Sequence, residues 1–312
     1  MKLRTRTDLI YSNQVMPELP EVETIANGVH QRIHGQIIVD VQINNNPQTF
    51  KSPPTEIANV LAGSRIDRVH RVGKTIVADL IRPDKKSRPG KKKSGTPNLD
   101  SETRASQDSI HSSQSAQLLI HLGMTGRLLV SSSETEVPPH THAILTLSGG
   151  KELRFVDPRR FGRLSVSTET YTGPGQEPLT ISLEDFIDLF RNRKTPIKAA
   201  LLNQSFLHGV GNIYADEALF HAGIRPRRQA GRLTRDELTR LRAALIKVLK
   251  HAIKLGGSSV SDYVDADGVA GFFQLHHRVY SRTGEPCRTC STPIERIVIG
   301  GRSTHFCPTC QK

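Results

Sequence analysis

The sequence has no tryptophan, only 5 tyrosines in 312 residues, and no cysteine before position 287. With so few aromatic side chains, few residues are available to stack on a nucleobase. No stretch approaches the roughly 18 uninterrupted apolar residues that a membrane-spanning helix requires. Residues 1–15 also lack the apolar core of a secretory signal. These absences argue against insertion into a membrane and against export.

Positive charge, by contrast, is in excess. The chain has 43 Lys and Arg against 30 Asp and Glu, a net charge of +13, of which residues 1–15 carry +2 and residues 82–117 carry +4. The remaining +7 lies outside these two segments. A basic surface favours a polyanionic partner such as nucleic acid, although a surface selected only for solubility would have the same composition.

All four cysteines lie in the last 26 residues, as the pairs Cys287/Cys290 and Cys307/Cys310, with sixteen residues between the pairs. This spacing is typical of a four-thiolate zinc site, in which each pair sits on a tight turn. The alternative is two disulfides in a secreted protein, which the missing export signal disfavours. Four thiolates leave no coordination position for the nearby His305 or for water, so we expect one structural Zn²⁺.

Hydrophobic periodicity predicts an α+β fold for a chain whose length suggests about two domains. Residues 17–35 predict an amphipathic helix that ends at Gly35. Short segments then predict a β-sandwich or barrel up to about residue 168, and the period is helical from residue 181. Residues 83–116 are rich in Lys, Ser, Gly and Pro, and we expect a disordered insertion there. Its KKSRPGKKK run either touches phosphate nonspecifically or is a solvated loop.

Individual elements follow from the same patterns. Strands are expected at 37–43, 65–69, 74–81, 117–122, 127–130, 143–147, 152–156 and 163–166, and a short one at 297–299 between the cysteine pairs. Further helices are expected at 183–191, 196–203, 212–221 and 234–255, the last of them ended by Gly256 and Gly257.

The most unusual string is Met16-Pro17-Glu18-Leu19-Pro20. Methionine before proline is a good context for removal of an initiator methionine, which would expose Pro17 as an N-terminal secondary amine. Such an amine can attack an electrophilic sugar carbon and form an iminium ion, as a Schiff-base lysine does. An α-amino group titrates at about 7.7–8.0, so far more of it is unprotonated at neutral pH than of a lysine. The alternative is that Pro17 merely begins a helix.

A resemblance to a known family rests on several strings in order: PELPEVET, HLGMTG, DPRRFG, GVGNIYADEALFHAGI and the two cysteine pairs. From Met16 to Lys312, with 83–116 excluded, the chain resembles the bacterial formamidopyrimidine-DNA glycosylases. These enzymes excise oxidised purines, notably 8-oxoguanine and formamidopyrimidines. The resemblance implies base-excision repair by a bifunctional glycosylase and AP lyase, with damaged double-stranded DNA as the partner.

The resemblance also implies a division of the chain. Residues 16–170 would form an N-terminal helix with a β-sandwich, 171–275 a helix–two-turn–helix DNA-binding domain, and 276–312 a zinc finger. Residues 263–272 align with the family's lesion-recognition loop. A monomer in the bacterial cytoplasm is the corresponding expectation.

By the same resemblance, four residues carry the chemistry. Pro17 matches the N-terminal proline that attacks C1′ of the damaged nucleotide, and Glu18 matches the carboxylate that assists opening of the sugar ring. Lys74, in RVGKTIV, matches a lysine that contacts phosphate beside the lesion and donates a proton for β-elimination. Arg302, in GRSTHFC, matches the zinc-finger arginine that holds phosphate and is linked to δ-elimination.

Three further residues, Met124, Arg159 and Phe161, match the trio that fills the gap left by the extruded nucleotide. An enzyme that acts on C1′ must take the nucleotide out of the stack. An apolar wedge and a planar cation can replace the lost stacking and pairing. From spacing alone, Met124 and Phe161 would rather belong to the core.

Four positions match DNA contacts of the family: His140, Arg160, Lys198 and Asn212. For the first of these, the neighbouring His142 is an equal candidate. Gly209 and Gly211 are expected to let the backbone approach phosphate closely. Asn212 is expected to cap the next helix and leave its first amides to an anion, and a capped helix without a ligand is the alternative.

One feature departs from the family. A peptide bond at Pro17 would remove the nucleophile, yet fifteen residues precede Met16. We therefore expect residues 1–15 to be a mis-assigned start or a leader that is removed. If Pro17 stays acylated, the alternative is a non-catalytic protein that binds damaged DNA. Endonuclease VIII-like enzymes, which prefer oxidised pyrimidines, begin more like PEGPE where Leu19 stands here, and tend to lack the full filling trio.

Overall fold

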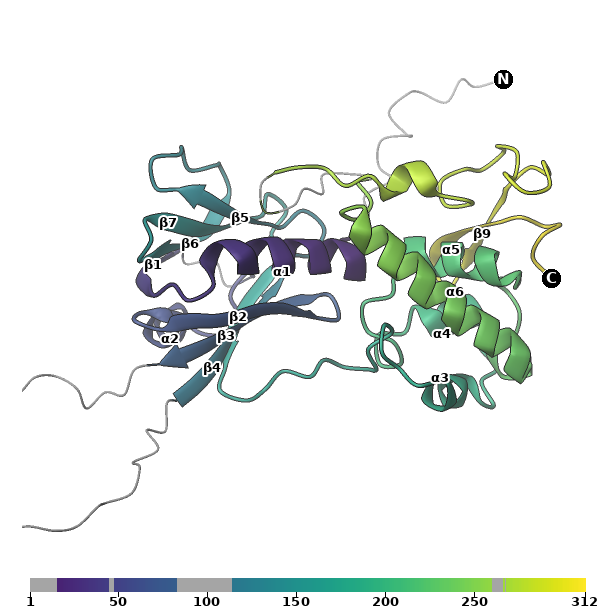
Figure 1. Cartoon of the computed structure of the whole chain (residues 1–312), viewed down its shortest axis with the longest axis horizontal. Helices are drawn as coiled ribbons and strands as arrows, with labels where there is room; N and C mark the ends of the chain where they lie inside the picture. The colour runs from purple at the N-terminus through teal and green to yellow at the C-terminus, as the bar shows by residue number, and fades with distance from the viewer. Residues whose placement is uncertain (1–15, 45–47, 83–113, 260–265, 267) are drawn as a thin grey trace, which may run out of the picture.

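The computed structural model describes residues 16–44, 48–82, 114–259, 266 and 268–312. The expected leader at 1–15 and most of the expected insertion lie outside the described residues. Residues 114–116, however, were expected in the insertion and instead begin a strand, since they pair with residues 80–82. Figure 1 shows a β-rich lobe and a helical lobe, with helix α1 running from one to the other.

Two four-stranded antiparallel sheets form the β-rich lobe. The first has the order β1 (Ile38–Ile43), β6 (Thr141–Leu147), β7 (Lys151–Val156) and β5 (Arg127–Ser132). The second has the order β2 (Arg65–Val72), β3 (Thr75–Arg82), β4 (Gln114–His121) and β8 (Arg163–Ser167). Every strand expected here from alternating hydrophobicity is present, with its ends shifted by a few residues.

Helix α1 (Leu19–Ile33) connects the two lobes through their cores. Its stripe of Val22, Ile25, Val29 and Ile33 is buried in one hydrophobic cluster with residues of both sheets. Leu19, one turn earlier, belongs instead to the cluster of the helical lobe. The first turn of α1 therefore stands at the boundary between the lobes, which is where Pro17 and Glu18 lie.

Among the described residues, the helical lobe contains four α-helices: α3 (Leu183–Phe190), α4 (Ile197–Leu201), α5 (Asn212–Ala222) and α6 (Arg235–Lys254). The last begins with a capping box between Thr234 and Glu237. It ends as expected, because Gly256 and Gly257 both have a positive φ that favours glycine. In the described residues, no helix has the length and apolar character that crossing a membrane would need.

Four short elements were not expected from the sequence, and one of them is a 3₁₀ turn at Ala230–Arg232. Helix α2 (Pro54–Leu61) is short, and only Ile57, Val60 and Leu61 form its buried face. The C-terminal module pairs β9 (Glu295–Ile299) with β10 (Arg302–Phe306), of which only the first was foreseen, and a 3₁₀ turn spans Phe273–His276. Such short polar segments have too few apolar residues to show a period.

Candidate active site and zinc site

A cavity of about 570 Å³ opens where the two lobes and the C-terminal hairpin meet. It is lined by residues from distant parts of the chain that the sequence had singled out, namely Glu18, Lys74, Met124, Asn212 and Arg302. Pro17 is buried at its edge, and Met16 lines the cavity itself. The tertiary structure thus brings the expected catalytic positions together.

Glu18 is a buried carboxyl with a strongly shifted pKa in this cavity. Its side chain is 2% exposed, and Oε1 accepts a hydrogen bond of 3.1 Å from the Ile213 amide in the first turn of α5. Oε2 is buried without a hydrogen-bond partner among the described residues. Burial raises the pKa of Glu18 to about 7, although the nearby Lys74 opposes the rise. Glu18 can therefore exchange a proton near neutral pH.

The start of α5 differs from the expectation in two ways. The N-cap is Gly211 and has no side-chain cap bond, so the prediction that Asn212 caps the helix is wrong. A Cβ on Gly211 would lie 2.2 Å from the Glu18 carboxyl carbon. Gly211 thus makes room for the Glu18 carboxylate. This carboxylate binds at the N-terminus of α5, where we had expected an anion such as phosphate to bind.

Glu21 holds Glu18 in place. Glu21 Oε2 accepts a hydrogen bond of 2.9 Å from the Glu18 amide, and Oε1 accepts one of 2.7 Å from the Ser258 amide and another from the Tyr214 hydroxyl. Burial raises the pKa of this carboxyl as well. The sequence showed Glu21 only as an acidic residue in a helix's first turn, because its partners lie on α5 and after α6.

Lys74 and Arg302 are two of the cations that line the same cavity. Lys74 lies in the turn between β2 and β3, one residue before the strand in which it was expected. Burial lowers the pKa of Lys74, while Glu18 opposes the shift and Arg302 adds to it. Arg302 is exposed at the first position of β10. A carboxyl and two cations from three separate elements can therefore act on one bound group.

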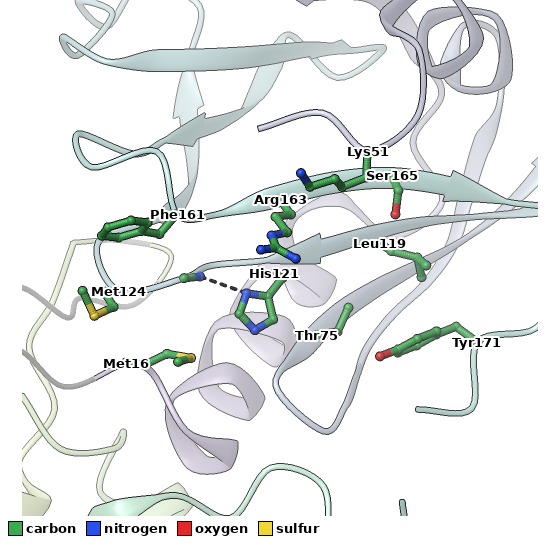
Figure 2. Close-up of a pocket in the computed structure, with 11 residues that line it drawn as sticks. Met16, Lys51, Thr75, Leu119, His121, Met124, Phe161, Arg163, Ser165 and Tyr171 are labelled. Atoms are coloured by element: carbon green, nitrogen blue, oxygen red, sulfur yellow. Dashed lines mark hydrogen bonds between the residues drawn. The ribbon is translucent and has the colours of Figure 1, made fainter. Parts of the chain in front are cut away.

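The expected filling trio lies beside a second cavity, of about 600 Å³, which Figure 2 shows. Met124 and Phe161 line it, and Phe161 is 49% exposed, so the core alternative fails for the phenylalanine. The Arg159 guanidinium carbon lies 4.9 Å from the centre of the Phe161 ring. Such a cation–π contact keeps the two side chains together at the surface.

The loop that carries Phe161 is held by Asp157. Its buried carboxylate accepts hydrogen bonds from the Gly162 amide at 2.7 Å, the Arg159 amide at 3.2 Å and the Thr125 hydroxyl at 2.5 Å. Thr125 follows Met124, so this one carboxylate ties both wedge-bearing turns together. The DPRRFG string therefore builds a rigid loop around its aspartate.

The expected DNA contacts are placed unequally. His140 and Arg160 are exposed, with φ of 65° and 60°. His142, the other histidine candidate, is buried, and its Nε2 lies 2.9 Å from the Asp157 carbonyl oxygen. Asn212 lines the first cavity.

Lys198 does not meet the expectation of a DNA contact, because its side chain is fully buried. Its Nζ lies 2.6 Å from Asp216 Oδ1 and donates hydrogen bonds to the Ser303 carbonyl and the Thr304 hydroxyl. The structure thus directs this cation into the protein and away from any phosphate in the cavity.

His121 and Tyr280 are among the lining residues that sequence reasoning missed. The Gly123 amide donates to His121 Nδ1 at 3.2 Å, as the dashed line in Figure 2 marks. Burial lowers the pKa of His121 and so favours its neutral ring. Because Nδ1 accepts the hydrogen bond from the Gly123 amide, the proton of the neutral ring lies on Nε2. His121 stands three positions before Met124 in the same HLGMTG string, which was the available signal.

The four cysteines form one compact group. All four sulfurs lie within 4.8 Å of one another, with Cys287 to Cys310 at 3.9 Å and Cys290 to Cys307 at 3.4 Å. A tetrahedral zinc with bonds of about 2.3 Å requires sulfurs about 3.8 Å apart, whereas a disulfide requires about 2.05 Å. The donor set therefore fits a closed zinc site. His305 turns away from it, with Nδ1 at 3.3 Å from Asp216 Oδ2.

Removing a base from a duplex requires something to fill the vacated stack and a protonatable group near the sugar. Adjoining cavities of this protein present both. The fold and the site define the class as a DNA glycosylase.

Comparison with known proteins gives the family. Residues 16–164 match the model of the formamidopyrimidine-DNA glycosylase N-terminal domain, 174–264 that of the formamidopyrimidine-DNA glycosylase H2TH domain, and 284–312 that of a zinc finger found in FPG and IleRS. The chain is 43% identical to the formamidopyrimidine-DNA glycosylase of Solibacter usitatus, over 95% of this chain and 100% of that protein.

Two solved structures extend the match. The MutM (Fpg) protein of Thermus thermophilus has a TM-score of 0.74 and 38% identity, covering 95% of this chain and 98% of that one. A Lactococcus lactis FPG mutant in complex with Fapy-dG containing DNA has a TM-score of 0.78 and 28% identity, covering 95% and 100%. The chain belongs to the formamidopyrimidine-DNA glycosylase family. It is a glycosylase and AP lyase of base-excision repair, with DNA as its partner and a structural zinc.

Proposed function

We propose that Pro17, with its nitrogen free, is the nucleophile that removes oxidised purines from double-stranded DNA. The observation that carries this proposal is the adjacent Glu18. Its carboxyl is buried, its pKa is about 7, and its Oε2 has no hydrogen-bond partner among the described residues. These properties suit proton transfer. The Lactococcus lactis relative solved with Fapy-dG containing DNA supports the choice of a purine lesion.

The chemistry balances with the groups at hand. The Pro17 nitrogen forms a bond to C1′ as the glycosidic bond breaks, and the proton that this nitrogen then loses passes to the departing base. Proton transfer from Glu18 to the ring oxygen opens the sugar and leaves an iminium ion. Loss of a C2′ proton then expels the 3′ phosphate, and loss of a C4′ proton expels the 5′ phosphate.

Lys74 and Arg302 take the phosphate side of this reaction. Both line the cavity that Glu18 lines, and they come from different elements, the β2–β3 turn and β10. Lys74, whose pKa burial lowers, serves β-elimination as the proton donor, and Arg302 serves δ-elimination by holding the phosphate that leaves. Fixed cations in a partly dehydrated site stabilise developing phosphate charge better than water does.

The remaining positions hold the duplex. Met124, Arg159 and Phe161 fill the gap in the stack, and His140, Arg160 and Asn212 contact phosphate or base edges. The working unit is a monomer of the bacterial cytoplasm, divided into the helix and β-sandwich domain at 16–170, the DNA-binding domain at 171–275 and the zinc finger at 276–312.

The mechanism requires Pro17 to be the first residue of the active form. An amide nitrogen has no lone pair available for attack, so an acylated Pro17 cannot form the iminium ion. Met16 lines both cavities, so its removal would open space beside Pro17. The active protein therefore begins at Pro17.

Borohydride trapping tests the proposal. Two forms of the protein, one beginning at Met1 and one at Pro17, are incubated with a duplex containing 8-oxoguanine and reduced. A covalent adduct with the Pro17 form alone is expected. Adduct formation by the form that retains residues 1–16, confirmed by intact mass, would refute the role of Pro17, and equal binding without any adduct would indicate a non-catalytic binder of damaged DNA.

A further inference from the structure

Lys198 is a lysine whose hydrogen-bonding capacity is used up inside the protein. An ammonium group has three N–H donors. Around Lys198 Nζ stand three acceptors, Asp216 Oδ1 at 2.6 Å, the Ser303 carbonyl at 2.7 Å and Thr304 Oγ1 at 2.8 Å. No donor is left for a DNA phosphate, so Lys198 must influence the reaction through the residues that it holds.

Those residues are the ones that follow Arg302 in β10. Lys198 binds Ser303 and Thr304, and Asp216 Oδ2 accepts a hydrogen bond of 2.9 Å from the His305 amide. Three consecutive residues of β10 are thus fastened to α4 and α5 by one ion pair. Arg302, directly before them, is exposed and lines the cavity.

Stability alone is a poor reason for such an arrangement. Burying an ion pair carries a large desolvation penalty, and apolar residues of similar volume often stabilise a protein as well or better. Burial lowers the pKa of Lys198, and Asp216 opposes that shift. Apolar packing is not directional, whereas charge-assisted hydrogen bonds are. The bonds from Lys198 to Ser303 and Thr304, and from the His305 amide to Asp216, therefore fix the position of this segment of β10.

We propose that Lys198 is a positioning residue that aims Arg302 at the phosphate released by δ-elimination. The inference rests on the proposed role of Arg302. Lys198 does not touch the DNA, and its effect passes through Ser303 and Thr304. Loss of Lys198 therefore changes the second elimination and leaves the attack by Pro17 in place.

The test compares Lys198→Met with Arg302→Ala and with the double variant, each beginning at Pro17 and loaded with zinc, on a duplex with an abasic site. We expect Lys198→Met to lower the ratio of δ to β product by about tenfold or more, since a misplacement of about 1 Å can cost about 10²-fold. Borohydride trapping is expected to stay within about twofold of the parent. In the Arg302→Ala background, Lys198→Met is expected to change nothing further.

A matched control removes another buried cation. Arg154 is 1% exposed and bonds carbonyl groups within the β-rich lobe, far from β10 in the sequence. Arg154→Met is expected to leave the product ratio unchanged. If Lys198→Met fails to fold, Lys198→Met combined with Asp216→Asn removes both charges and keeps an acceptor for the His305 amide, and it should show the same ratio.

Three results would overturn the inference: an unchanged ratio in folded Lys198→Met, a further fall when Lys198→Met is added to Arg302→Ala, or an equal change in Arg154→Met. An Arg302→Ala variant with the parent ratio would overturn it too, by removing its premise. Failure of the proposed function is distinguishable, because the parent Pro17 form would then give no borohydride adduct at all.

Discussion

The Ile213 amide donates a hydrogen bond of 3.1 Å to the Glu18 carboxylate across 195 positions of sequence. This bond and the next amide of α5 favour the ionised carboxylate, as the N-terminus of a helix does. Burial outweighs them, since the pKa of Glu18 still rises to about 7. The helix thus orients the carboxylate, and the burial sets its proton affinity.

Stability should depend on pH through Glu18. Its pKa is about 7 in the folded protein against 4.5 for an unperturbed group, so the folded state binds this proton more tightly. The free energy of unfolding should therefore fall as pH rises from about 4.5 to 7, by at most about 3 kcal/mol from this group. The glutamine of Glu18→Gln cannot titrate, so the variant should lack this loss of stability. Urea unfolding at pH 5 and pH 8 should therefore show a free energy of unfolding that is higher, relative to the parent, at pH 8 than at pH 5.

The chain that begins at Met1 is the suitable protein for this measurement, because an acylated Pro17 does not titrate. The buried Glu217 remains in both proteins, and its raised pKa cancels in the comparison. Glu21 interacts electrostatically with Glu18, so the difference between the two proteins reports on this pair of carboxyls. A stability difference between Glu18→Gln and the parent that stays constant from pH 5 to pH 8 would contradict the assigned burial.

Gly211→Ala should lower the rate of base excision about 10²-fold while the protein stays folded. The added Cβ would stand 2.2 Å from the Glu18 carboxyl carbon, so the carboxylate must move by an ångström or more. A displacement of about 1 Å can reduce a rate about 10²-fold, and single-turnover excision measures it. Gly149→Ala is the control, since there the new atom meets only the end of the flexible Gln36 side chain. Parental rates in Gly211→Ala would exclude this placement of Glu18.

Phe161→Ala should separate activity from stability. The side chain is half exposed, so its removal should lower the free energy of unfolding by less than about 1 kcal/mol. Excision from a duplex should fall at least about tenfold, because unstacking a base step costs a few kcal/mol that the ring helps to offset. Phe155→Ala, in the core at 1% exposure, should instead lower stability by about 3–5 kcal/mol. Unimpaired excision by Phe161→Ala would rule out the wedge.

Metal removal should disable strand cleavage reversibly. Elemental analysis should find one zinc per chain, and a chelator should remove it, disorder the β9–β10 hairpin and lower cleavage at least about tenfold, because structural zinc contributes folding energy directly. Added zinc should restore activity. Cys290→Ser should lose the metal, whereas His305→Ala should retain it, since the His305 ring faces Asp216. A His305→Ala variant without zinc would contradict the four-cysteine site.

Much of the secondary structure was predictable because it repeats a local pattern. The buried stripe of α1, the alternating strands of the sandwich and the capped α6 each contain enough apolar residues for a period to show. Strand β10 was not foreseen, because Phe306 is the only apolar residue of RSTHF, and helix α2 was not foreseen, because it buries only three apolar residues, Ile57, Val60 and Leu61. The zinc ligands were predictable for the same local reason, since the cysteine spacing contains the geometry.

The site was predictable only in part. Motif strings identified Glu18, Lys74 and Arg302, and the structure places all three on one cavity. Their electrostatics could not be foreseen, because a pKa depends on burial and on neighbours that lie far away in the sequence. Lys198 is an example of a residue whose environment the sequence did not reveal. Its position in the motif suggested a DNA contact, but its side chain is buried and pairs with Asp216.

By itself, the sequence determined the elements, the zinc ligands and the family, since each is written in short strings or in composition. Only the tertiary structure decided which charges meet. It set Glu18 against Gly211 and the start of α5, and turned Lys198 inward to β10. The reason is that hydrogen bonds and desolvation act over a few ångströms in space, a distance that separation along the chain does not reveal.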